Sequence, residues 1–281
     1  MSAEPLPLSV ESSGLPPGPG TDTFLLLHGY GASSFSWRTW APFLAERGHV
    51  LAVDMKGFGR APKPDDGRYA PSDQAALMLR LVRERDLARV TLMGHSLGGG
   101  VALYVALGLR DAGEAHRLER LVLVAGAAYR QLLPPFVALA RRPRISTLAL
   151  RALGPEMVIA QALRAIVFES SHITRDQIRG YAAPLHAPGS LDALFHAARQ
   201  ILPPDLDRLT PRYSEIDVPT LLLWGRQDNV VPLWVGRRLA GALPRSTLHV
   251  LERCGHMPAE ERPQESLAAL RAFLSAHPSR R

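Results

Sequence analysis

The sequence has little cysteine and little lysine. Cys254 is the single cysteine among 281 residues, so no disulfide can form within the chain and a disulfide-stapled scaffold is excluded. Only Lys56 and Lys63 are lysines, and the other 31 basic residues are arginines. Their longest runs are pairs, whereas nucleic-acid binding favours a basic cluster or stripe. We therefore expect no nucleic-acid partner, despite a formal net charge of +7.

The sequence also lacks a long hydrophobic run and a targeting segment. Its longest apolar stretch, Leu97 to Leu109, is too short to span a bilayer. The first 20 residues have neither the basic start nor the apolar middle of a signal peptide. We therefore expect a cytoplasmic protein without a membrane partner. A hydrophobic content of 46% excludes a disordered chain and supports one sizeable core.

Short apolar runs bounded by Gly, Asp or Pro are typical of buried parallel strands. They are Thr23 to Leu27, Val50 to Val53, Val90 to Met93, Leu121 to Val124, Thr220 to Trp224 and Thr247 to Leu251. Helix-like segments alternate with them: Trp37 to Arg47, Pro71 to Arg85, Leu97 to Leu109, Leu233 to Ala242 and Pro263 to Ala276. This alternation predicts an α/β fold with a mostly parallel sheet and helices on both faces. Ser9 to Ser13 adds one edge strand.

The alternation of strand and helix fails in residues 127–215. This stretch has apolar residues at helical spacing, and prolines divide it into short helices. We interpret it as a helical insertion into a core formed by residues 1–126 and 216–281. Because parallel sheets bind ligands at the carboxyl ends of their strands, an insertion there is expected to cover the site as a cap.

One motif carries most of the chemical information. Gly94-His95-Ser96-Leu97-Gly98 stands between the strand ending at Met93 and the helix from Leu97. This G-x-S-x-G arrangement is typical of a nucleophile elbow, a tight turn that exposes a serine hydroxyl above the sheet. Gly94 and Gly98 give the turn room, His95 supports it, and the Leu97 amide faces developing negative charge.

A serine needs a base and an acid, and the chain order serine, acid, histidine is typical of such an elbow. Asp228 follows the strand ending at Trp224, and His256 follows the strand ending at Leu251, so both lie on the rim that carries Ser96. The rival acid position, Ala125-Gly126-Ala127-Ala128, has no carboxylate. Asp54 follows an earlier strand and is expected to organise its own loop.

A second backbone donor for an oxyanion is expected in the loop His28-Gly29-Tyr30-Gly31. Its glycines permit unusual backbone angles and close approach, and the Tyr30 amide is the predicted donor beside that of Leu97. His28 and Gly29 support this loop. Phosphate-loop, dinucleotide-loop and zinc-ligand spacings are missing from the sequence, so we expect no cofactor and no metal.

Taken together, these motifs resemble the α/β-hydrolase superfamily. The resemblance covers nearly the whole chain outside the insertion. It implies a capped serine hydrolase similar to small-ester carboxylesterases, carbon–carbon bond hydrolases and cofactor-free haloperoxidases. Epoxide hydrolases and haloalkane dehalogenases carry a carboxylate at the elbow, so Ser96 argues against both. The starting hairpin is shortened to the run from Ser9 to Ser13, which predicts a truncated sheet.

The resulting functional prediction is hydrolysis of a carboxylic ester or lactone through an acyl-enzyme on Ser96. An acyltransferase, thioesterase, carbon–carbon bond hydrolase or perhydrolase would use the same residues. A non-catalytic ligand receptor on the same fold is the alternative of another class. The expected partner is a small-molecule substrate. The sequence leaves open whether the chain forms a homodimer. Aromatic residues at helical spacing in the insertion are more typical of a core than of a pocket, and Phe168 and Phe195 are the candidates for facing the substrate. Arg141, Arg142, Arg144 and Arg151 are expected to be solvated.

Overall fold

A seven-stranded sheet organises the computed structural model, which describes residues 5–18 and 20–279. The strand order is β1-β3-β2-β4-β5-β6-β7; β1 is antiparallel to β3, and the other neighbouring pairs are parallel. The strands are β1 (Ser9–Gly14), β2 (Thr23–Leu27), β3 (His49–Asp54), β4 (Val90–His95), β5 (Leu118–Val124), β6 (Thr220–Gly225) and β7 (Ser246–Leu251). The α/β fold predicted from the alternation of strands and helices is confirmed.

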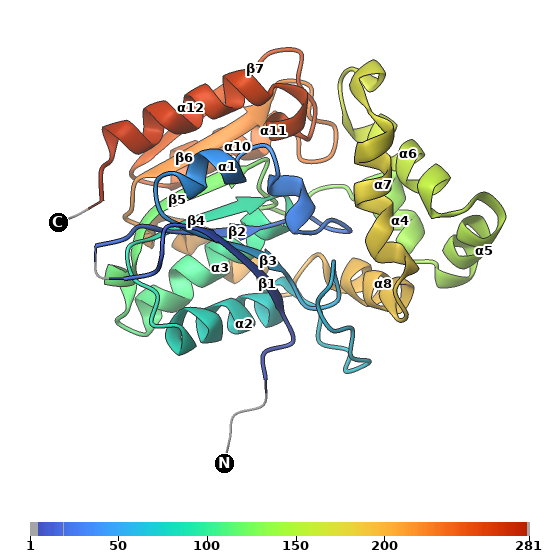
Figure 1. Cartoon of the computed structure of the whole chain (residues 1–281), viewed down its shortest axis with the longest axis horizontal. Helices are drawn as coiled ribbons and strands as arrows, with labels where there is room; N and C mark the ends of the chain where they lie inside the picture. The colour runs from blue at the N-terminus through green and yellow to red at the C-terminus, as the bar shows by residue number, and fades with distance from the viewer. Residues whose placement is uncertain (1–4, 19, 280–281) are drawn as a thin grey trace.

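Helices cover both faces of the sheet (Figure 1). On one face pack α2 (Pro71–Glu84), α3 (Leu97–Asp111) and α10 (Leu233–Ala242); on the other pack α1 (Ala41–Ala45) and α12 (Pro263–Ala276). Along β2, Leu25 and Leu27 join the first core, and Phe24 and Leu26 join the second. This alternation follows from side chains of a strand pointing to opposite faces, and it explains why β2 is apolar throughout.

The helix expected from Trp37 to Arg47 is wrong in its length. The structure has a 3₁₀ helix at Ser34–Trp37 and a separate α1 limited to Ala41–Ala45. Pro42 lies in the first turn of α1. A proline fits there, but it cannot donate a backbone hydrogen bond to a preceding turn. The segment therefore divides into two short helices.

Helical elements alone occupy the described chain between β5 and β6. They are α4 (Pro135–Ala140), α5 (Pro143–Leu153), α6 (Pro155–Ile166), η3 (Ser170–His172), α7 (Arg175–Ala182), η4 (Ala183–His186), α8 (Ser190–Gln200), α9 (Leu206–Leu209) and η5 (Thr210–Glu215). Three of them begin at a proline, which suits the first helical position. Figure 1 shows α4 to α8 together beyond one end of the strands. No helix in the described ranges is long and apolar enough to cross a membrane.

Candidate active site

Ser96 occupies a strained turn between β4 and α3. Its φ of 53° and ψ of −115° lie outside the regions that residues with a side chain prefer. The Ser96 carbonyl accepts hydrogen bonds from the amides of Gly99, at 3.0 Å, and Ala127, at 2.9 Å, while its own amide donates to Val124. These bonds from two neighbouring segments hold the serine in a conformation that it would not adopt alone.

Two glycines make this turn sterically feasible. A Cβ atom on Gly94 would lie 2.3 Å from the carbonyl oxygen of Gly98. A Cβ atom on Gly98 would lie 2.3 Å from the carbonyl oxygen of Leu27, at the end of β2. Any larger side chain would push α3 away from the sheet. The glycines of the sequence motif thus stand where the backbone segments approach most closely.

Asp228 and His256 form a buried pair at the ends of β6 and β7. The Nδ1 atom of His256 lies 2.9 Å from Oδ2 of Asp228. The other carboxylate oxygen accepts the amides of Val230 and Val231, each at 2.9 Å. A neutral imidazole in this arrangement carries its proton on Nδ1, which leaves the lone pair of Nε2 available. Nε2 has no hydrogen-bond partner among the described residues.

The main chain of His256 is held from two sides. Its amide donates to the carbonyl of Ile166 in α6 at 2.9 Å, and its carbonyl lies 2.9 Å from Nε2 of His95. Glu261 adds a third support, because its carboxylate accepts the amides of Gly255 and Met257, each at 2.9 Å. Sequence reasoning missed Glu261; the only signal was an acidic residue shortly after the histidine.

The two other histidines of the loop motifs are neutral supports. His28 is fully buried; its Nε2 accepts the Met55 amide and its Nδ1 donates to the Gly29 carbonyl. Burial lowers the pKa of His28. Burial, followed by the nearby His256, lowers the pKa of His95 to about 3. His95 is therefore neutral near pH 7 and donates its Nε2 proton to the carbonyl of His256.

Two backbone amides stand free beside Ser96. The amides of Tyr30 and Leu97 have no hydrogen-bond acceptor within the described part of the chain, and both residues line the same cavity as Ser96. Gly29 brings the first loop close, since a Cβ atom placed on it would lie 3.3 Å from Cβ of Ser96. The Tyr30 hydroxyl donates to the Leu194 carbonyl in α8 at 2.9 Å, which ties this loop to the cap helices.

A cavity of about 600 Å³ lies between the sheet and the helices of residues 127–215. Ser96, His256, Tyr30 and Leu97 line its floor, and mainly aliphatic and aromatic side chains form its walls. No Asp, Glu, Lys or Arg is among the lining residues. Its polar side chains away from Ser96 include Gln131, Ser146, Gln161 and Asn229. Sequence reasoning did not single these out, because isolated polar residues in loops and helices carry no pattern.

Comparison with known proteins places the chain in a family. The sequence model of the Alpha/beta hydrolase family matches residues 24–270. The chain belongs to the α/β-hydrolase family. The uncharacterized hydrolase YugF of Bacillus subtilis is 29% identical over 88% of this chain and 87% of its own. A second relative is a 2-hydroxy-6-oxononadienedioate/2-hydroxy-6-oxononatrienedioate hydrolase of Cupriavidus pinatubonensis. It is 28% identical over 85% of this chain and 82% of its own.

Solved structures agree with this assignment. An esterase from Thermogutta terrifontis superposes with a TM-score of 0.75, at 25% identity over 96% of this chain and 94% of that one. The resemblance to α/β-hydrolases that the motifs indicate is therefore confirmed, and the chain is a hydrolase of this family.

The cap aromatics of this α/β-hydrolase divide into two groups. Phe195 is 7% exposed and lines the cavity, as the sequence predicts. The same prediction is wrong for Phe168, which is 42% exposed and absent from the lining. Phe168 lies beyond the end of α6, where its amide donates to Glu261 and its ring lies 5.9 Å from the Arg253 guanidinium. Phe168 therefore contacts the core residues Arg253 and Glu261 rather than the cavity.

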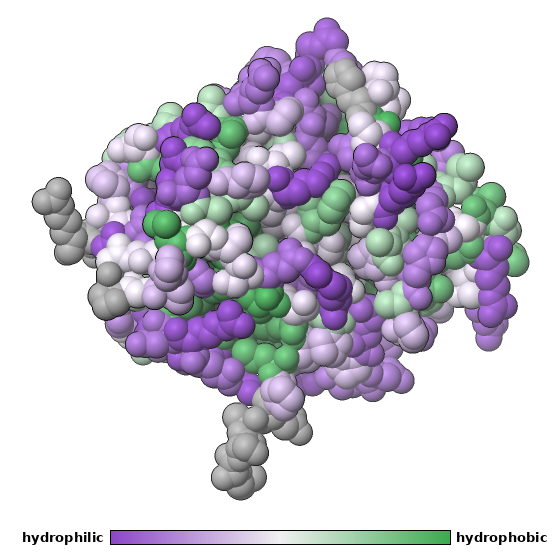
Figure 2. Space-filling view, in the orientation of Figure 1, coloured by the Kyte–Doolittle hydropathy of each residue, from purple (hydrophilic) through white to green (hydrophobic). Residues whose placement is uncertain are grey.

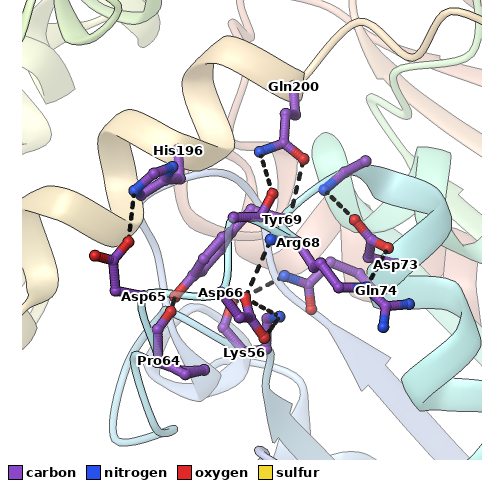
Figure 3. Close-up of polar contacts among 12 residues, drawn as sticks. Lys56, Pro64, Asp65, Asp66, Arg68, Tyr69, Asp73, Gln74, His196 and Gln200 are labelled. Atoms are coloured by element: carbon purple, nitrogen blue, oxygen red, sulfur yellow. Dashed lines mark hydrogen bonds and ion pairs between the residues drawn. The ribbon is translucent and has the colours of Figure 1, made fainter.

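A core loop, residues 56–69, contacts α8, the helix that carries Phe195 (Figure 3). The amide of Tyr69 donates to Oε1 of Gln200 at 3.2 Å, and Nε2 of Gln200 donates to the Gly67 carbonyl at 2.9 Å. Nε2 of His196 lies 3.2 Å from Oδ1 of Asp65. The loop itself is braced by the ion pair of Lys56 and Asp66, at 2.8 Å. These contacts hold α8 beside the loop, and Phe195 of α8 forms part of the cavity wall.

A buried carboxylate anchors α7 in the same way. Glu260 accepts both terminal nitrogens of Arg38, at 2.9 and 2.8 Å, as well as Nε2 of Gln177 and the Tyr181 hydroxyl. Burial, reinforced by the charge of Glu260, raises the pKa of Tyr181. Tyr181 therefore stays protonated and donates. The contact joins the cap helix to the short α11 (Pro258–Glu261), which directly follows His256.

Asp54 and Cys254 are buried and contribute to the structure around the site. Asp54 is buried and accepts the amides of Ser34, at 2.6 Å, and Arg60, at 2.8 Å, so it organises two loops. Cys254 is buried, and burial raises the pKa of its thiol.

Within the described ranges, no three His, Cys, Asp or Glu side chains converge where a metal ion could bind.

Proposed function

We propose that the chain hydrolyses carboxylic esters or lactones through an acyl-enzyme on Ser96. One observation carries the proposal: Ser96 in a strained elbow and His256, which is paired with buried Asp228, line the same apolar cavity. A serine hydroxyl becomes a useful nucleophile only beside a base, and the base needs an acid that sets its tautomer. The three residues meet these needs from three different strand ends.

The proposed steps follow from the protonation of His256. Its Nε2 takes the proton of the Ser96 hydroxyl as the oxygen attacks the carbonyl carbon, and it then donates this proton to the leaving alkoxide. Asp228 accepts the hydrogen bond from Nδ1 and stabilises the imidazolium. A water molecule, deprotonated by Nε2, next attacks the acyl-enzyme and restores Ser96. The rigid hold on the backbone of His256 keeps the ring in position through both halves of the reaction.

The free amides of Tyr30 and Leu97 form the proposed oxyanion hole. Each donates to the carbonyl oxygen once negative charge develops on it. Such donors are preorganised, so they need no rearrangement at the moment of reaction. Removal of one donor of this kind typically raises the barrier by about 2.7–4 kcal/mol. Because both donors are main-chain groups, they are sensitive to the loop geometry that Gly29 and Gly98 permit.

The lining of the cavity favours a neutral substrate with an apolar acyl or alcohol part. A carboxylate bound there would be buried without a cationic partner, which is costly. The relative from Cupriavidus is named for a dioate, a compound with two carboxylates. We therefore do not carry that substrate over to this chain. An ester of medium chain length fits the volume and polarity better.

Labelling and turnover of matched variants test the proposal. A fluorophosphonate should modify Ser96, and Ser96→Ala should lose this labelling and about 10⁴–10⁶-fold in kcat for p-nitrophenyl esters. Ser146→Ala is the control, because Ser146 also lines the cavity but donates to the Leu139 carbonyl. It should retain labelling and turnover. A Ser96→Ala variant within tenfold of wild type, or labelling at another serine, would contradict the assignment.

The acceptor of the acyl group is tested separately. Water is the default acceptor, whereas an alcohol, a thiol or peroxide would give an acyltransferase or perhydrolase. Product analysis with added alcohol or peroxide distinguishes them. Free acid as the main product supports a hydrolase, and an ester or peracid as the main product at low acceptor concentration contradicts it.

A further inference from the structure

The outer surface of the cap exposes an unusual amount of apolar side chain. Most of the large hydrophobic residues that are well exposed in the described chain lie within residues 132–157, with Leu132 at 94% and Leu148 at 68% exposure. The others in this stretch are Leu139, Ile145, Leu153 and Met157. Single exposed leucines are ordinary, but a concentration of them marks an interaction site. Figure 2 shows hydrophobic side chains at the outer edge of the molecule, where α5 lies, with strongly hydrophilic ones beside them.

The part of this stretch that precedes Glu156 is basic and contains no acid. Residues 132–155 include Arg141, Arg142, Arg144 and Arg151, and no Asp, Glu or Lys. All four arginines are exposed, and none forms an ion pair with a described residue. The first acid beyond them, Glu156, is already paired with His186 at 3.1 Å. The arginines are thus solvated, as the sequence predicts, and their charge is not neutralised locally.

Helical spacing places the two kinds of side chain next to each other. On α5, Leu148 lies one turn from both Arg144 and Arg151, and it is also one turn from Ile145. The exposed face of α5 therefore mixes aliphatic and guanidinium groups. A basic amphipathic helix of this kind lies in the plane of a lipid interface, with apolar groups at the acyl boundary and cationic groups at the headgroups.

We propose that the outer face of α5 and the turn before it dock on an anionic lipid surface. Ile145 and Leu148 enter the interface, and Arg141, Arg142 and Arg144 contact lipid phosphates. A second copy of this chain is a poor occupant, because a symmetric contact would bring two arginine clusters together without an acid. The proposal differs from the sequence expectation of no membrane partner. That expectation rested on spanning segments, which a peripheral contact does not need.

The docking face continues into the catalytic cavity. Leu139 and Leu153, at 41% and 58% exposure, also line the cavity. A docked molecule would therefore place a cavity wall against the lipid, where apolar esters concentrate. This consequence for substrate access rests on the proposed ester hydrolysis, whereas the docking itself does not. Docking is accordingly measured on Ser96→Ala, which binds without turnover.

Vesicle co-sedimentation of the full chain tests the docking. The probes are vesicles of phosphatidylcholine alone and of phosphatidylcholine mixed with phosphatidylglycerol. We expect binding to the mixed vesicles that weakens as salt rises. R141Q/R142Q should weaken partitioning by roughly fivefold for each arginine removed, and L148S by about tenfold. The controls are R208Q/R237Q, which removes two exposed arginines outside the cap tip, and L15S, at a leucine of 45% exposure; both should match wild type.

Several outcomes would overturn the docking. These are absence of binding to mixed vesicles at low salt, equal loss in R208Q/R237Q, or a dimer in sedimentation velocity that L148S dissolves. Hydrolysis of a water-soluble ester, measured on the same substitutions in a chain that keeps Ser96, separates the two proposals. Intact hydrolysis without vesicle binding overturns the docking alone. Vesicle binding by a chain that hydrolyses no ester overturns the proposed function alone.

Discussion

Ser96 illustrates how a single residue depends on its neighbours. Its backbone conformation costs about 1–3 kcal/mol, and it persists only because Gly99, Ala127 and Val124 hold it by hydrogen bonds. The position of Ser96 is thus decided by main-chain contacts, and substitutions of the side chain should leave the turn intact.

The proposed acid can be distinguished from its rival by a matched pair of substitutions. Asp228→Asn should preserve packing yet lower kcat by about 10⁴-fold, because the amide favours the wrong imidazole tautomer. Asp54→Asn should instead reduce stability, since Asp54 holds the amides of Ser34 and Arg60 and lies in a separate loop. Active-site titration with ester turnover gives kcat, and denaturant unfolding gives stability. A larger loss of kcat in Asp54→Asn at equal stability would show that the acid is wrongly chosen.

At the scale of the elements, the end of α6 covers the cavity and also forms hydrogen bonds with the segments that carry Asp228 and His256. The carbonyl of Ile166 accepts the amide of His256, the carbonyl of Ala165 accepts Nδ2 of Asn229, and the amide of Phe168 donates to Glu261. Residues 165–168 therefore hold the backbone around Asp228 and His256, although they contribute neither of those side chains. Displacement of α6 would disturb the base as well as the cavity wall.

Phe195, which lines the cavity, and Phe168, which is exposed, provide a test of substrate selectivity in which Phe168 is the control. Phe195→Ala enlarges the cavity and should shift chain-length preference among esters by about 1–3 kcal/mol per methylene-sized change. Phe168→Ala removes an exposed ring of the same kind and should leave the ranking unchanged. The measurements are an ester panel and phosphonate titration of each variant. Unchanged ranking in Phe195→Ala, or lost labelling in a folded variant, would contradict the assigned role of the cap.

At the scale of the whole molecule, buried neutral histidines make stability depend on pH. Burial lowers the pKa of His28, whereas a histidine in the unfolded chain titrates near about 6.5. Below that pH the unfolded chain binds the extra proton, so acid favours unfolding. We expect the free energy of unfolding to fall as pH decreases from about 7 to about 5, by up to about 1.4 kcal/mol per pH unit for this residue.

A matched pair of variants isolates this contribution. His28→Gln keeps an acceptor for the Met55 amide and a donor for the Gly29 carbonyl, but it cannot titrate. Its free energy of unfolding should depend less steeply on pH than that of wild type. Exposed His116 supplies the control, and His116→Gln should keep the wild-type slope. Equal slopes in wild type and His28→Gln, from urea unfolding at several pH values, would refute the linkage.

The sequence by itself determined the parallel sheet, the elbow at Ser96 and the candidate partners Asp228 and His256. These features are local: an apolar run, a turn rich in glycine and a side chain at the next strand end each leave a pattern in adjacent residues. The order of parallel strand ends then places the three residues on one rim. Asp54 also stands at a strand end, so this rule alone does not separate it from Asp228.

The tertiary structure alone decided what surrounds that rim. Helical spacing shows which cap residues share a face, but it does not show which face meets the core. Phe195 and Phe168 therefore look equivalent in sequence, but the structure buries Phe195 at the cavity and leaves Phe168 exposed beyond the end of α6. The support of His256 by Ile166 and the exposed apolar face of α5 likewise depend on contacts between distant segments. Such contacts result from the packing of the whole chain, so short-range patterns cannot encode them.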